Sequence, residues 1–144
     1  MSDFFRAIVA QINTDVCGDP YTIACVYDPS EYTIHSNSLP YKSMYVICRL
    51  HFKAEHAQLI IAVCSEYPTT FDATRVPKMI ASVISREPTR YQTKQTPLSM
   101  LSGHAEYRII YNFEYADPNF YDNLLSTLAV AATLQLESIC ETLV

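Results

Sequence analysis

The residues best suited to catalysis or metal binding are four histidines and five cysteines. The histidines are His35, His51, His56 and His104, and the cysteines are Cys17, Cys25, Cys48, Cys64 and Cys140. Their spacing contains no C-x-x-C pair and no pattern typical of a zinc site. The sequence therefore predicts no metal site, and it favours histidines at the surface or at strand edges.

Three pairs of neighbouring residues could exchange protons: Cys64 with Glu66, Glu55 with His56, and His104 with Glu106. A serine nucleophile would need a strained turn such as G-x-S-x-G, which the sequence lacks. Cys64 falls on an apolar position of an alternating run, where cysteine behaves as a small hydrophobic residue. We therefore expect no catalytic residues, with a small enzyme as the alternative.

Composition excludes several classes of partner. Only 17% of the residues are charged, against about 25% in an average domain, so much of the surface must be hidden in a core or against a partner. The net charge of −5 gives no general attraction to nucleic acid or to an anionic membrane. Two isolated glycines cannot build the loops that hold phosphate groups. We expect no cofactor, no nucleic acid and no membrane contact.

The compartment follows from the cysteines and from the start of the chain. Met1 to Arg6 lacks the features of a secretory signal, and no apolar run approaches 18 residues. An odd number of cysteines, four of them within apolar runs, is typical of reduced thiols. The sequence predicts an acidic cytoplasmic protein with five reduced cysteines.

Hydrophobic periodicity predicts the elements of the first half. A helix is expected from Ser2 or Asp3 to Asn13 because its apolar residues follow the three-four spacing of one buried face. Strands are expected over 21–27, 32–36, 44–53 and 57–65. The last of these is apolar on both faces, which is typical of a central strand.

The second half is predicted to hold two helices and one strand. A middle helix starts at Asp72 or Thr74 and ends at Pro88, and its buried stripe is Met79, Ile80, Val83 and Ile84. A strand over 107–115 leads into a long helix from Asp117 to about Thr142. Residues 1–144 are thus expected to form a single α+β domain. Its antiparallel sheet has about five strands, with N-terminal, middle and long C-terminal helices.

Residues 85–104 are interpreted as a long polar loop or a partly ordered excursion. Arg86, Arg90 and Lys94 give this segment a small basic patch on an acidic protein. It is either solvated and mobile or a recognition loop that becomes ordered on a partner.

Eleven tyrosines and six phenylalanines, without tryptophan, are the most unusual feature of the composition. Tyrosines on strands fill half-exposed positions, stack on nucleic-acid bases in a basic surround, or form protein interfaces. The predicted interface combines a strand with the outward side of the final helix. Its residues are Tyr107, Tyr111 and Tyr115 on the strand and Leu124, Ala131 and Leu134 on the helix. The strands and final helix carry more apolar surface than one face each can bury, which predicts a homodimer.

The order of elements resembles the YbjN and type III secretion chaperone-like group. The resemblance is carried by Tyr107 to Asp117 (YRIIYNFEYAD), which runs into Phe120 to Leu143, with Arg75 to Ser85 in the place of that group's second helix. A second resemblance, in Leu59 to Pro68 (LIIAVCSEYP), is to the RWD and ubiquitin-conjugating-like folds.

Both resemblances imply a protein-binding domain with no catalytic residues to carry over, and the first implies a dimer. We therefore expect a non-enzymatic chaperone-like protein, adaptor or inhibitor of another protein. The alternative is a small enzyme or ligand-binding protein with an apolar pocket between sheet and helices.

Overall fold

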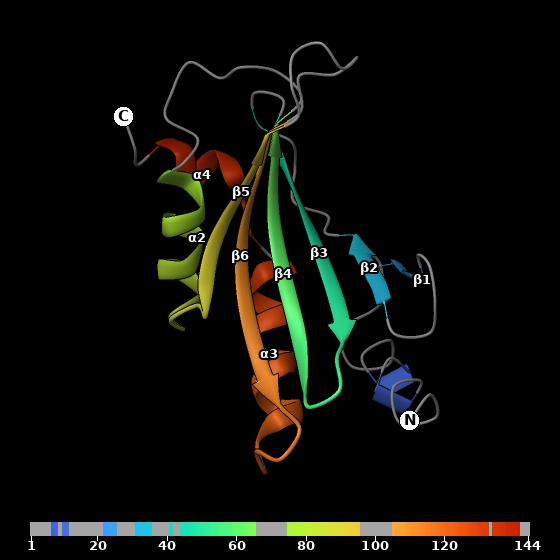
Figure 1. The fold of residues 1–144 in the computed structure, drawn as a ribbon. Helices are drawn as coiled ribbons and strands as arrows, with labels where there is room; N and C mark the ends of the chain where they lie inside the picture. The colour runs from blue at the N-terminus through green and yellow to red at the C-terminus, as the bar shows by residue number, and fades with distance from the viewer. Residues whose placement is uncertain are drawn as a thin grey trace.

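Six antiparallel strands form one sheet, in the order β1-β2-β3-β4-β6-β5, in the computed structural model of the chain (Figure 1). The structure describes residues 7–8, 10–11, 22–25, 31–35, 41, 44–65, 75–95, 105–132 and 134–141. Its strands are β1 (Thr22–Cys25), β2 (Glu31–His35), β3 (Met44–Phe52), β4 (His56–Ser65), β5 (Arg90–Gln95) and β6 (Ala105–Glu114). The predicted α+β class is confirmed, with six strands in place of about five.

The centre of the sheet follows directly from the sequence pattern. Along β3, alternate residues from Met44 to Phe52 are buried, which is the period of two that a strand imposes. Strand β4 lies between β3 and β6 and is buried on both faces, as its uninterrupted apolar run predicts. Its register pairs Ile61 with Cys48 on β3 and with Ile109 on β6.

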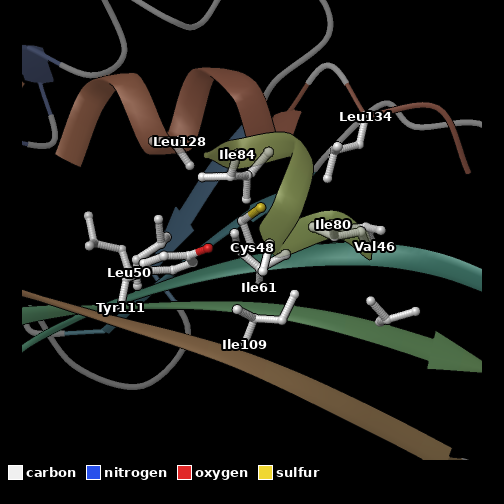
Figure 2. Close-up of a cluster of buried hydrophobic side chains, with 14 of the residues drawn as sticks. Val46, Cys48, Leu50, Ile61, Ile80, Ile84, Ile109, Tyr111, Leu128 and Leu134 are labelled. Carbon is white, nitrogen blue, oxygen red and sulfur yellow. The ribbon is translucent and has the colours of Figure 1, made fainter. Parts of the chain in front are cut away.

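Helix α2 (Arg75–Ile84) contacts α3 (Phe120–Ala132) and α4 (Leu136–Glu141), and α2 and α3 lie against one side of the sheet (Figure 1). Figure 2 shows Ile80, Ile84 and Leu128 from the helices meeting side chains from the central strands. Residues 7–8 and 10–11 are also helical, and Ile8 joins this core. Among the described helices, none has both the length and the apolar character that crossing a membrane requires.

The prediction of a loop over 85–104 is wrong for its first half, because β5 occupies Arg90–Gln95 and pairs with β6. An edge strand has only one neighbour and contributes little to the core, so its residues need not alternate between apolar and polar. The polar sequence RYQTKQ therefore resembles a loop although it forms a strand. Residues 96–104 lie outside the described part, as do Gly18, Cys17 and His104.

The predicted single C-terminal helix is also wrong, because α3 ends at Ala132 and α4 begins at Leu136. Leu134, in the link before α4, and Leu136, the first residue of α4, are both buried. Residues two apart on a continuous helix point in nearly opposite directions, about 160° apart, so a straight helix would expose one of them. Interrupting the helix lets both leucines enter the same core.

The buried face of α2 is rotated from the predicted stripe. Ile80 and Ile84 are buried as expected, together with Val76, Pro77 and Ala81. Val83, predicted to be buried, is 50% exposed, and Met79 is only partly buried. Val76, Ile80 and Ile84 follow the spacing of four and centre the buried face, which leaves Val83 on its flank.

Candidate functional site

An apolar groove lies where α2 faces α3 and α4. It has a volume of about 410 Å³ and is lined by Met79 and Val83 of α2, Val130 of α3, and Leu134, Gln135, Ser138 and Ile139 from the α3–α4 link and α4. We call this set of residues the helix groove. Its lining thus comes from the flank of α2 that the core leaves uncovered and from the end of α3, the link after it and α4.

The chemistry of the helix groove is that of a binding surface. Its lining contains no charged residue and only two polar ones, Gln135 and Ser138. Val83 projects at the rim, and the exposed large hydrophobic side chains of the described residues are Val83 and Tyr91. A groove of this kind can bury an apolar side chain of a partner.

A second feature occupies the side of the sheet that faces away from α2 and α3, which we call the outer face. Figure 2 shows Cys48, Ile61 and Ile109 pointing toward the helices. Because side chains alternate along a strand, the residues next to each of these three point the other way. The described side chains of the three central strands on the outer face include Arg49, Gln58, Ile60, Ala62, Cys64, Glu106, Arg108 and Ile110.

Glu106 lies on the outer face, near the start of β6, and is held by two arginines. Its carboxylate accepts a hydrogen bond from Arg49 Nη1 at 2.7 Å and one from Arg108 Nη2 at 3.2 Å. Its side chain is 4% exposed, against 30% for Arg49 and 20% for Arg108. Burial alone would raise the pKa of Glu106. The hydrogen bonds and charges of the two arginines outweigh it and hold the pKa below 4.5.

The cluster therefore keeps one unit of positive charge in excess. Two guanidinium groups surround one ionised carboxylate, and Arg108 Nε is buried with no hydrogen-bond acceptor among the described residues. Arg90 on β5 is exposed and pairs with Ile110, which places it on the same face, one strand away from Arg108. This part of the outer face is cationic although the protein is acidic overall.

The buried thiols are unreactive. Burial raises the pKa of Cys48 to about 12. Burial, followed by the negative charge of Glu106, raises that of Cys64 to about 11. Both thiols are thus protonated at neutral pH and are poor nucleophiles. Cys140 is buried as well, and no disulfide joins these three residues.

The three tyrosines that were predicted to form an interface make contacts within the chain. Tyr111 is 2% exposed and donates a hydrogen bond to the Arg86 carbonyl at 3.1 Å. The Tyr115 hydroxyl donates to the Lys53 carbonyl at 2.8 Å, which fastens the end of β6 to the β3–β4 turn. Tyr107 is partly buried and packs against the core. These hydroxyls join β6 to neighbouring parts of the chain, and an interface formed by the three tyrosines stays a prediction.

The predicted outward side of the final helix is also wrong. Leu124 and Ala131 are fully buried and Leu134 is 4% exposed, so all three belong to the core. The helix is apolar around much of its circumference, and the periodicity therefore does not decide which side faces the sheet. Of the three residues, Leu134 also lines the helix groove.

The predicted basic patch of Arg86, Arg90 and Lys94 divides between two roles. Arg86 donates from Nη2 to Asn123 Oδ1 at 3.1 Å, and its guanidinium lies 5.5 Å from the centre of the Phe113 ring. It therefore joins the turn after α2 to α3 and to β6. Arg90 is exposed on β5, and Lys94 pairs with Glu106 in the backbone register.

No group of three or more metal-ligating side chains gathers anywhere in the described ranges. Two histidines lie on the outer face. His51, near the end of β3, pairs with Gln58, and His56, at the start of β4, pairs with Glu114. Val83 was predicted to be buried, and the surplus of apolar residues noted in the sequence lay on the strands and the final helix, so it did not point to Val83.

Comparisons with known proteins add no relative. No family model matches the chain, and it matches neither a curated protein nor a solved structure.

Proposed function

We propose that this chain is a non-enzymatic protein-binding domain that holds an apolar segment of a partner in the helix groove. The observation that carries the proposal is Val83, half exposed at the rim of an uncharged groove. Water contact with such a surface is unfavourable, and covering it with a complementary apolar side chain stabilises a complex. The partner protein belongs to the cytoplasm, where the buried thiols stay reduced.

The first partner that we propose is a second copy of the chain. A two-fold axis beside the helix groove would bring Val83 of each copy against the groove of the other, so that both rims are covered at once. The low share of charged residues, 17%, favours such self-association. The dimer contact predicted from the sequence moves accordingly, from the buried Leu124 and Ala131 to the helix groove.

The core weighs against a ligand pocket between sheet and helices. Large side chains from both layers fill this space, among them Tyr111, Ile80 and Leu128, all less than 3% exposed. A chaperone-like or adaptor role, which the resemblances imply, needs only a surface site, and the helix groove supplies one.

Partner capture from an extract of the source cell tests the proposal. The wild type is compared with Val83→Asp, which places a charge in the groove, and with Ser82→Asp, which adds the same charge at the exposed neighbouring position. We expect Val83→Asp to lose a bound protein that Ser82→Asp retains, by about tenfold or more, because an unpaired charge in an apolar contact is costly. Equal capture by the two variants contradicts the proposal, provided that both melt like the wild type.

A further inference from the structure

Strand β5 is an edge of the sheet with features that suit a specific kind of partner. It is the last strand in the order and pairs with β6 alone among the described strands (Figure 1). The edge of a sheet presents main-chain donors and acceptors that can pair with another strand. We call the six residues Arg90–Gln95 the β5 edge.

The side chains of the β5 edge differ between its two faces. Arg90 and Gln92 are exposed and pair with Ile110 and Arg108, so they lie on the outer face beside the cationic cluster. Tyr91 pairs with Ile109 on the opposite face and is 47% exposed. An added strand would therefore meet cationic and polar groups on one of its faces and an aromatic ring on the other.

Charge separates the candidate occupants. The β5 edge contains Arg90 and Lys94 and no carboxylate. Glu106, which pairs with Lys94, is already neutralised by Arg49 and Arg108. A second copy of β5, paired antiparallel about Gln92, would bring Arg90 of one copy opposite Lys94 of the other, and like charges directly opposite are unfavourable. The same cations attract an acidic strand.

Nucleic acid is the weaker candidate. Single-stranded nucleic acid needs aromatic rings on the binding face as well as cations. Tyr107, Tyr111 and Tyr91 lie on the face that the helices cover, or at its margin, and Tyr45, which lies on the outer face, is on β3, three strands away from β5. The overall charge of −5 also opposes a polyanion, which extends well beyond one patch.

We propose that the β5 edge binds an extended acidic segment of a partner protein as an additional strand. Acidic residues of the segment alternate with apolar ones, so that carboxylates face Arg90 and Arg108 while apolar side chains face Tyr91. At physiological salt, charges more than about 8 Å apart are largely screened, so the local cations outweigh the distant negative charge of the protein. This site is separate from the helix groove, and each can fail while the other stands.

Fluorescence anisotropy with labelled eight-residue peptides tests the proposal. The probe is a Glu-Val repeat, and its controls are a Lys-Val repeat, the Glu-Val repeat with N-methyl groups on alternate main-chain nitrogens, and a single-stranded oligouridine. We expect the Glu-Val peptide to bind at least tenfold more tightly than each control, because charge and main-chain pairing both contribute. Binding should weaken as salt is raised.

The matched variants are Arg90→Glu on the edge and Arg75→Glu on α2, which change the net charge equally at two exposed sites. Arg90→Glu should weaken binding of the Glu-Val peptide about tenfold, and Arg75→Glu less than twofold. Arg90→Gln repeats the test without reversing a charge, and a circular-dichroism melt checks the fold of each variant.

Three results would overturn the proposal. Equal binding of the Lys-Val peptide removes the charge argument, and equal binding of the methylated peptide removes strand pairing. Tighter binding of oligouridine assigns the surface to nucleic acid. The proposed function would survive any of these results, since Val83→Asp leaves the β5 edge unchanged.

Discussion

Glu106 illustrates how one residue of the sheet keeps its charge although it is almost inaccessible. Glu106 lies just before the strand predicted over 107–115, and only the register of the folded sheet reveals that arginines from two strands converge on it. Register depends on how three distant segments pair, which local periodicity does not specify. For the same reason the sequence assigned the hydroxyls of Tyr111 and Tyr115 to a partner, whereas the chain itself uses them.

Replacing Glu106 with glutamine should destabilise the protein by about 1–3 kcal/mol near neutral pH, because two part-buried guanidinium groups lose their carboxylate. The pKa of Glu106 is lowered on folding, so its contribution is present above pH 4.5 and is lost as the pH falls through the folded-state pKa. Urea unfolding at several pH values measures the difference between wild type and Glu106→Gln. It should narrow below pH 4.5, and a difference that stays constant between pH 7 and pH 3 would contradict the assignment.

Elements with a strong period were predictable, and those whose period is weak or misleading were not. The alternation in β3 and the apolar run of β4 predicted the two central strands within a few residues. Asp117 was predicted to start the final helix, and its carboxylate does accept a hydrogen bond from the Asn119 N–H at 2.9 Å, although α3 begins at Phe120. The β5 edge and the break before α4 carried no such signal, since neither contains the glycine or proline that marks a turn.

The C-terminal end of α2 offers a test at this scale. Ser85 follows the helix with φ of 59°, a left-handed conformation that disfavours residues with a β-carbon. Ser85→Gly should stabilise the protein by roughly 0.5–1 kcal/mol, because relief of this conformation exceeds the entropy cost of glycine. Ser82→Gly, at an exposed position within the helix, should cost about 0.5 kcal/mol. Thermal melts that shift in the same direction for both variants would argue against strain at Ser85.

For the whole molecule, composition indicated a surface to be covered but not its position. The predicted α+β class is confirmed, and the large apolar side chains that the described part leaves exposed are Val83 and Tyr91. The rotation of α2 and of the final helix was predicted wrongly, because each helix has more apolar residues than its buried face holds. That rotation buries Leu124 and Ala131 and exposes Val83, and it thereby moves the candidate site to the helix groove.

Binding through the helix groove is the central claim, and the molar mass in solution tests it most directly because it needs no unknown partner. Light scattering at micromolar concentration compares the wild type with Val83→Asp and with Ser82→Asp. The account predicts about twice 16.4 kDa for the wild type and for Ser82→Asp, and 16.4 kDa for Val83→Asp. A wild type of 16.4 kDa, or a Val83→Asp variant that remains dimeric, would contradict self-association through this groove.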